Sequence, residues 1–491
     1  MAHRKDRTSR RKSDPGTLSY RPLSEKTVLA CELPWGAPKY VPISPLDYDL
    51  PPGIYAAQSV LVDLFALFDR KLHAVIEDDP IEKLINKSLQ RGEDAYMDNL
   101  IHTLYACIAW YERKEKEIME KINPANDNRF LLQKKLMSAN YLLCLVLIEV
   151  LPQAEFHLTS CESQINYILN LCFRQVAYKD PLTLGVNHAN HIYVLAETNA
   201  EVLGVLSLNF FSHIHQAFFA QLSDLKKDTT SPAAVNNMIA LLGSMKFLKI
   251  KTNQVTDFEV GIRFLDELGT YFLEVKDKDV KHAVAGLLVE ILLPVASQIK
   301  REANIPALIS FVSRLYVPTN DLASKKQHKL AAFPLLTCLL CVSQRPFFLQ
   351  NWVSFLSATL ANLKNRDPKI SRVALESLYR LLWVYMIRIG GDGNTSTRSR
   401  LESICNSLFP KGNRSVTPRD APINIFVKII HFIAQQKLDF AFREIIFELL
   451  AVNRQQRSLY PERMNIGIRA LMVIADGLQQ KEEPPAMPKT M

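Results

Sequence analysis

The sequence contains little glycine. Only 16 of its 491 residues are glycine, the residue that most readily adopts the positive φ angles of tight turns. A β-sandwich or β-barrel with many hairpins would need more such positions. No segment sustains the alternation of apolar and polar residues that marks a half-buried strand. The sequence therefore predicts an all-α fold.

Long apolar runs are also missing. A membrane-spanning helix needs about 20 predominantly apolar residues. The longest stretch without a formal charge, 202–223, is interrupted by Asn209, His213 and His215, and the apolar run at 142–151 is short and contains Glu149. The charged N-terminus is not followed by an apolar stretch, so it lacks the pattern of a secretory signal. These absences predict a soluble intracellular protein.

Metal-binding and redox motifs are incomplete. Cys338 and Cys341 form a CxxC, but no second CxxC or nearby His pair completes a zinc site. Their context, PLLTCLLCVSQ, is apolar throughout, which predicts buried thiols in a helical core. A metal site could be imagined at His188, His191, His213 and His215. No carboxylate or thiolate clearly completes that set, and we expect no metal.

Catalytic motifs are missing as well. The glycines within 390–393 could suggest a phosphate loop, but no GK[ST] follows them, so a linker between helices is the favoured interpretation. No GxSxG nucleophile elbow is present. The sequence therefore predicts a protein without a catalytic residue or a bound cofactor.

What the sequence does contain is an internal repeat. Two segments resemble each other: DKDVKHAVAGLLVEIL at 277–292 and DPKISRVALESLYRLL at 367–382. Each places a basic residue two positions before an alanine and a leucine four positions after it. Related alanines lie at 240, 283, 331 and 374. Steps of about 40–47 residues with helical patterning are typical of HEAT and armadillo repeats.

The repeat predicts a HEAT/armadillo-like α-solenoid of stacked antiparallel helix pairs over 51–480. Ala283 and Ala374 are expected to be buried where one helix crosses another. Prolines at 294, 306, 318, 334 and 346 are expected at helix starts or in linkers, because proline disrupts a helix interior. The segments 390–399 and 409–422 are expected to be loops, with helices resuming at 423–435, 438–452 and 461–479.

The two ends of the chain differ from this body. Residues 1–26 contain eight Lys and Arg against three Asp and Glu, and several prolines follow, so 1–50 is predicted to be a disordered basic and proline-rich tail. Thr8 and Ser13 each follow a basic residue by three positions and are possible phosphorylation sites. Residues 481–491 are predicted to be a linker to a C-terminal region.

Three basic residues occupy equivalent repeat positions: Lys281, Lys329 and Arg372. They could line one face that meets an acidic partner. Alternatively, they could form hydrogen bonds between adjacent repeats and so fix the stacking. The second interpretation is favoured, because a strict repeat position is what stacking itself requires.

Several longer segments carry a family resemblance. They include SLQRGED at 88–94, FLEVKDKDVKHAVAGLLVEILLPVA at 272–296, DPKISRVALESLYRLLWVYMIRI at 367–389 and PERMNIGIRALMVIADGLQQK at 461–481. In these segments, the chain from about residue 81 to its C-terminus resembles the N-terminal region of the Furry family of cell-morphogenesis proteins. The first 50 residues lie outside the resemblance.

The resemblance implies a non-enzymatic scaffold that binds NDR-family (Tricornered-like) kinases with Mob co-activators. It also implies roles in polarised growth and in neurite and dendrite patterning, in the cytoplasm with association with the cell cortex and microtubules. The family supplies no catalytic residue. The alternative hypothesis is a solenoid that carries cargo, or binds nucleic acid or microtubules, through its basic tail.

A scaffold needs a partner surface on exposed charged residues that stacking does not require. The candidates are Lys276, Lys278, Lys369 and Arg388, because they flank the two clearest repeat helices near their turns or ends.

Overall fold

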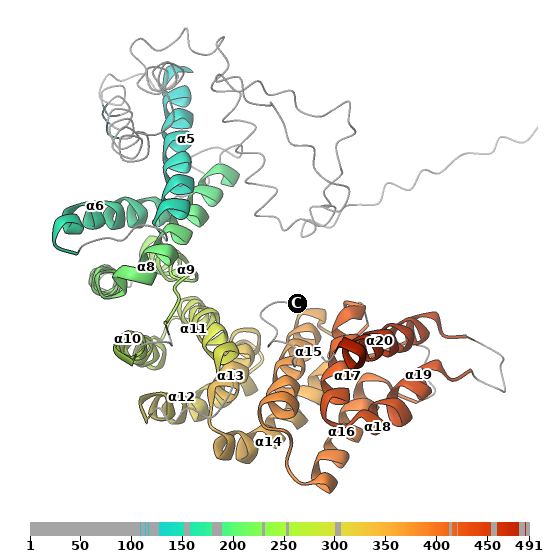
Figure 1. Cartoon of the computed structure of the whole chain (residues 1–491). Helices are drawn as coiled ribbons and strands as arrows, with labels where there is room; N and C mark the ends of the chain where they lie inside the picture. Colours follow the sequence, from blue (N-terminus) through green and yellow to red (C-terminus); the bar gives the residue numbers. More distant parts are fainter. Residues whose placement is uncertain are drawn as a thin grey trace, which may run out of the picture. The chain divides into compact units, whose positions relative to one another are not determined.

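The computed structural model describes residues 127–151, 158–178, 189–227, 231–251, 255–299, 306–411, 415–419, 421–452 and 459–480, together with 109, 113, 116 and 487. The tail at 1–50, with Thr8 and Ser13, lies outside the described residues, as does most of the predicted solenoid before Asp127. The described part is helical and contains no strand, which confirms the all-α prediction (Figure 1). The chain divides into two compact units, 1–206 and 207–491.

The first unit contains α5 (Asp127–Val150), α6 (Leu158–Val176) and the first half of α8 (Ala189–Lys226). Its apolar side chains repeat at helical spacing and are buried, among them Leu143, Leu147 and Leu203. The thiol of Cys144 lies in this core and is hydrogen-bonded to Thr198, and burial raises its pKa to about 12. This cysteine is therefore a neutral core side chain.

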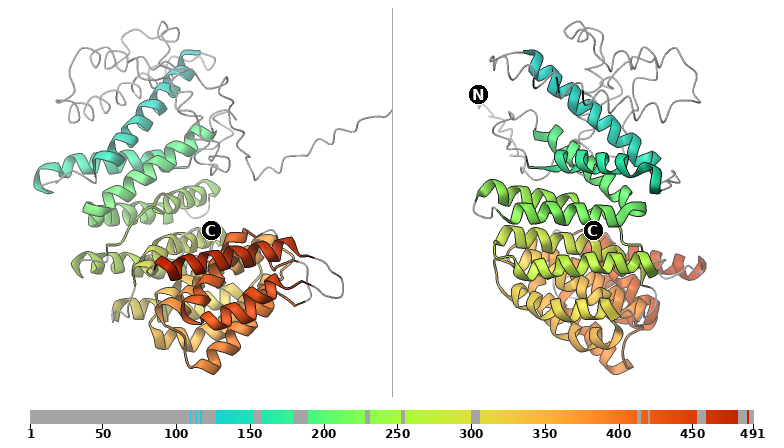
Figure 2. Two further views of the ribbon diagram at one scale, coloured as in Figure 1. Left: turned by 45° about the vertical axis from the view of Figure 1, so that its right-hand side comes forward. Right: turned by 90° about the vertical axis from the view of Figure 1, so that its left-hand side faces the viewer.

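The second unit is built from two rows of helices (Figures 1 and 2). The first row comprises α10 (Val255–Glu274), α12 (Pro306–Ser324), α14 (Arg345–Leu363) and α16 (Asn394–Leu408). The second row comprises α9 (Pro232–Ser244), α11 (Lys278–Gln298), α13 (Lys329–Val342), α15 (Pro368–Trp383), α17 (Ile423–Gln436) and α20 (Pro461–Gln480). A π-helix, η5 (Val384–Arg388), extends α15. Before α20 the chain forms α18 (Leu438–Phe440), η6 (Ala441–Ile446) and α19 (Phe447–Leu450).

Contacts between these helices define a solenoid. Each of α11, α13 and α15 packs on the first-row helix that precedes it in the chain. Along the second row, α9 contacts α11, α11 contacts α13, α13 contacts α15, α15 contacts α17 and α17 contacts α20. Short connections make each pair antiparallel. The predicted HEAT/armadillo-like stack is thus confirmed for the described residues, and the pairing continues beyond residue 390.

The core of the stack lies between the rows and between neighbouring pairs. In α13 the side chains of Leu335, Leu336, Leu339 and Leu340 are all fully buried. Cys338 and Cys341 are fully buried in the same helix, which confirms that this CxxC consists of core thiols. A leucine removed from water in this way contributes about 2 kcal/mol.

Among the described residues, two helices are long and apolar enough to cross a membrane by length and composition, Ile192–Lys226 and Lys278–Gln298. The second is α11, whose apolar side chains are covered by α9, α10 and α13. Its hydrophobicity is therefore that of a central helix in the stack.

The register of the repeat differs from the prediction by one residue. Asp277 and Asp367, which are 90 residues apart, both cap helices: the Asp277 carboxylate accepts hydrogen bonds from the backbone N–H of Asp279 and Val280, and the Asp367 carboxylate accepts one from the N–H of Lys369. When α11 and α15 are aligned on these caps, Ala374 corresponds to Val284. Both of these side chains are fully buried.

Ala374 is therefore buried as predicted, whereas Ala283 is only partly buried and that prediction is wrong. The reason is that the second segment has one more residue between its cap and its alanine, Pro368. The two alanines therefore occupy different positions relative to the buried face of their helices. The caps identify the equivalent positions correctly because they fix where each helix begins.

The prolines also depart from the prediction. Pro306 and Pro346 do begin helices, but Pro294, Pro318 and Pro334 lie inside α11, α12 and α13. Each interior proline removes one backbone hydrogen bond. These helices nonetheless persist because tertiary packing, rather than local propensity, provides most of a helix's stability. Likewise α16 begins at Asn394, inside the expected loop 390–399.

The last helix of the second row, α20, exposes apolar side chains that a neighbouring helix covers elsewhere in the stack. Counted from their first residues, Leu375 of α15 corresponds to Ile468 of α20, and Tyr379 corresponds to Met472. In α15 these positions are buried, and Tyr379 stacks on Phe432 of α17 at 5.2 Å. In α20 they are exposed, Ile468 by 48% and Met472 by 65%. The outward face of α20 thus exposes apolar side chains at positions that the next second-row helix covers in α15.

The corrected register gives a matched test. Ala374→Arg is expected to lower the free energy of unfolding by at least about 3 kcal/mol, through overpacking and a buried charge. Ala283→Arg should change it by less than about 1 kcal/mol, because this side chain reaches solvent. Chemical denaturation of both variants measures the difference. Equal destabilisation by the two substitutions would contradict the cap-based alignment.

Candidate functional site

Three successive turns of the second unit place basic residues side by side. They join α10 to α11, α12 to α13, and α14 to α15, and together with the first residues of the following helices they span 275–281, 325–329 and 364–369. We call this surface the basic edge. It is defined by the Lys and Arg residues of those turns: Lys276, Lys278, Lys281, Lys325, Lys326, Lys329, Lys364, Arg366 and Lys369.

Hydrogen bonds between the turns show that the edge is continuous. His282 of α11 and His328, which precedes α13, are joined through Nε2 and Nδ1 at 2.9 Å. Lys329 Nζ donates to Asn362 Oδ1 at 3.2 Å, which links the second turn to the end of α14. The three turns therefore lie next to one another along one edge of the stack.

The acidic residues of the same turns do not balance this charge. The turns contain nine Lys and Arg against three Asp. Two of the three, Asp277 and Asp367, already accept hydrogen bonds from backbone N–H groups as helix caps. Within the part of the chain that the structure describes, none of the nine basic side chains forms an ion pair. The edge therefore carries a net positive charge that the fold itself does not neutralise.

The pKa values of the edge reflect this charge. The pKa of His328 is lowered by burial and further by His282, Lys325, Lys281 and Lys278. Burial and then Lys325 also lower the pKa of Lys281. Each cation disfavours the protonation of its neighbours, so the turns are close enough to repel one another.

Three of the four predicted partner-binding residues lie on this edge. Lys276, Lys278 and Lys369 are exposed, as a partner surface requires. Whether they bind a partner stays a prediction. The sequence analysis did not single out Lys325 and Lys326. The repeat spacing could have found them, because the turn that contains them lies about midway between the equivalent turns at Asp277 and Asp367.

Arg388 lies elsewhere and has a structural partner. It ends η5, and its guanidinium donates hydrogen bonds to the carbonyl oxygens of Cys341 and Ser343, the latter at 2.9 Å. These carbonyls are at the C-terminus of α13, where the helix dipole favours a cation. Arg388 thus ties one helix pair to the previous pair.

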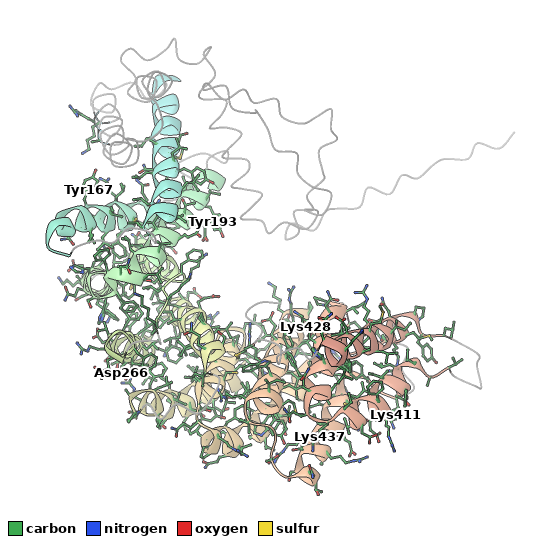
Figure 3. The ribbon with its side chains drawn as sticks, in the orientation of Figure 1. Tyr167, Tyr193, Asp266, Lys411, Lys428 and Lys437 are labelled. Atoms are coloured by element: carbon green, nitrogen blue, oxygen red, sulfur yellow. The ribbon has the colours of Figure 1, made fainter. Side chains whose placement is uncertain are left out.

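The predicted hydrogen bonds from Lys281, Lys329 and Arg372 to adjacent repeats are only partly present. Lys329 does form a hydrogen bond to the neighbouring repeat, but Lys281 lies 5.6 Å from the ring of Phe272, and Arg372 approaches Glu376 of its own helix at 3.8 Å. Other residues provide the ties. Examples are Arg314 to Asp266, which is labelled in Figure 3, Thr337 to Ser377, Lys437 to Asn394 and Arg469 to Asn424.

A second polar cluster surrounds the glycine loop between η5 and α16. The Tyr385 hydroxyl contacts Asp392 and lies 2.8 Å from Thr397 Oγ1, and Arg400 pairs with Asp392. Burial opposes ionisation of Asp392, but the hydrogen bonds from Arg400 and Tyr385 outweigh it and lower its pKa. The cluster closes the turn in which Gly390 and Gly391 have positive φ. The loop is thus a helix-to-helix linker, as predicted.

Metal-binding groups do not gather in the described residues: no three His, Cys, Asp or Glu side chains there are close enough to hold an ion. His215 instead contacts Glu267 of α10 at 3.1 Å. His188 lies outside the described residues, and the side chain of His191 is not described.

Comparison with known proteins shows which family the chain belongs to. The family described as "Cell morphogenesis N-terminal" matches residues 133–491, well over half of the chain. The chain belongs to the Furry family of cell-morphogenesis proteins. This confirms the family resemblance found in the sequence.

Two relatives place the match within much longer proteins. The cell morphogenesis protein PAG1 of Saccharomyces cerevisiae is 26% identical over 288 residues, which are 58% of this chain and 12% of that protein. The cell polarity protein mor2 of Schizosaccharomyces pombe is 24% identical over 413 residues, 80% of this chain and 18% of that protein. This Furry-family chain thus spans less than a fifth of either relative. No solved structure matches it.

The different environments of Arg388 and Lys369 give a test of their roles in this Furry-family chain. Arg388→Met is expected to lower the free energy of unfolding by about 2 kcal/mol, because two charge-assisted hydrogen bonds to the end of α13 are lost. Lys369→Met serves as the control and should change it by less than about 0.5 kcal/mol, since its side chain is exposed and unpaired. Urea denaturation would contradict the assignment if both variants unfolded like the unmodified chain.

Proposed function

We propose that this chain is a non-enzymatic scaffold that acts in cell morphogenesis and cell polarity. It binds an NDR-family (Tricornered-like) kinase together with its Mob co-activator and promotes kinase activation. The observation that carries the proposal is the basic edge: an exposed, unneutralised surface on a rigid helical stack in a Furry-family chain.

The physical advantage of such a stack is that it holds two partners near each other. A solenoid offers an extended surface that is ordered before binding. When kinase and co-activator occupy neighbouring parts of it, the second contact becomes intramolecular, and overall affinity rises by about 10²–10⁴ without any new contact. Activation then follows from effective concentration, and the scaffold needs no catalytic residue.

The same proposal gives the expected location. A scaffold of this kind would act in the cytoplasm, at the cell cortex and at sites of polarised growth, including neurites and dendrites, with access to microtubules. The names of the relatives, a cell morphogenesis protein and a cell polarity protein, support the broader role in cell morphogenesis and polarity.

Charge reversal on the basic edge tests the proposal. Lys276→Glu with Lys278→Glu is expected to keep the melting temperature, because both side chains are exposed. The same double variant should weaken capture of a purified preassembled kinase–Mob pair, because charges at the rim of an interface mainly accelerate association. The loss should be larger at low salt, where charges are less screened.

Lys428→Glu is the matched control. Lys428 is an exposed lysine on α17, outside the three turns (Figure 3), and its reversal should leave capture unchanged. Capture should also be measured with kinase alone and Mob alone. If the unmodified chain captures none of the three, the scaffold proposal fails. If the double variant captures the pair normally at low salt, binding takes place on another surface.

A further inference from the structure

The basic edge contains an energetic conflict that the fold does not explain. Lys278 and Lys329 are the first residues of α11 and α13, and Lys369 is the second residue of α15. A helix N-terminus carries the positive end of the helix dipole, so cations there are unfavourable. The stack repeats this unfavourable placement in three consecutive helices of the second row.

Local compensation is incomplete. Asp277 and Asp367 cap α11 and α15, but His328, which precedes α13, forms no capping hydrogen bond through its side chain. The charges of Lys325 and Lys326, in the turn before α13, are also uncompensated. Both side chains are exposed and have no ion-pair partner among the described residues. Departures from local rules that the fold does not compensate are characteristic of functional sites.

The spacing of the turns limits the kind of partner. Neighbouring packed helices lie about 8–10 Å apart. An extended peptide advances about 3.3 Å per residue. An extended peptide bound across the turns would therefore pass from one basic turn to the next about every three residues.

The composition of the edge favours a peptide over a single-stranded nucleic acid. Nucleic-acid grooves combine positive charge with exposed aromatic side chains on which bases stack. None of the exposed aromatic side chains in the described residues, such as Tyr167, Tyr193 and Phe447, lies in the three turns. Leu330 is exposed by 43% beside Lys329 and offers an apolar contact instead.

We propose that the basic edge binds an extended acidic peptide of a partner protein, with carboxylates about three residues apart that lie against successive turns. The central turn, with Lys325, Lys326 and Lys329, provides the main contact. This inference rests on the proposed scaffold function, because it identifies the feature by which a captured protein is recognised.

The test uses the full 491-residue chain and a fluorescein-labelled twelve-residue peptide, (Glu-Gly-Ser)4, read by fluorescence polarisation at low salt. Lys325→Glu with Lys326→Glu is expected to raise the Kd at least tenfold, whereas Lys428→Glu should change it less than twofold. The double variant should keep or raise the melting temperature, because it relieves repulsion with Lys281 and His328. A peptide with its four glutamates contiguous should bind more weakly than the spaced one.

Several results would overturn the proposal. Undiminished binding by the Lys325/Lys326 variant would assign the peptide to other basic residues, including those of 1–50. Equal loss in the Lys428 control would indicate non-specific attraction to net charge. Tighter, edge-dependent binding of a twelve-nucleotide oligouridine, or of vesicles containing phosphatidylserine, would assign the edge to nucleic acid or lipid.

The peptide assay and kinase–Mob capture fail independently. Capture that survives Lys325→Glu with Lys326→Glu, together with absent peptide binding, would refute the acidic-peptide edge and leave the scaffold function intact. Peptide binding without capture of kinase, Mob or the pair would refute the proposed partners and leave the edge as a peptide site.

Discussion

Side-by-side burial along the second row of helices is the constraint on which the rest of the structure depends. One helix pair can cover only part of its apolar surface, and α13 illustrates the consequence. This helix contacts α11 and α15 in its own row and α12 and α14 in the other row, and together these neighbours keep its leucines fully buried. Since each pair stabilises the next, stability in such a stack is a property of neighbours rather than of single repeats.

Polar ties then select one stacking register among those that apolar contact alone would allow. The hydrogen bonds from Arg314 to Asp266 and from Arg388 to the end of α13 join residues 48 and 45–47 positions apart in sequence. Thr337 and Ser377 add a buried pair at 2.8 Å. A sliding of one pair along another would break these bonds and leave buried polar groups unsatisfied, which is costly.

The sequence predicted the helices and their stacking because both follow from apolar spacing and repeat length. It located the register less well. The residues around Ala283 resemble those around Ala374, but the caps at Asp277 and Asp367 determine which side chains of each helix face inward. It misjudged Pro294, Pro318 and Pro334 for a related reason. Local preference excluded them from helices, whereas burial of the surrounding side chains offsets the missing hydrogen bonds.

The site, too, could be predicted only as far as local sequence features reach, because contacts between repeats form only in the folded stack. Exposure of Lys276, Lys278 and Lys369 follows from their position in turns, which the sequence indicates. The role of Arg388 does not, because its carbonyl partners lie in a preceding repeat and only the folded stack brings them within reach. Proximity between turns, such as the 2.9 Å contact of His282 with His328, is likewise visible only after folding.

The arrangement of charge follows from the architecture itself. In an antiparallel stack, all turns that lead into second-row helices lie on one edge, so the N-terminal ends of those helices and their dipoles gather there. Asp caps are the usual way to stabilise such ends, and α11 and α15 have them. The lysines beside these caps oppose the dipoles, and their mutual repulsion lowers the stability of the edge. A partner bearing carboxylates would offset both unfavourable terms at once, so the charge that weakens the free stack would also favour binding of the proposed acidic peptide.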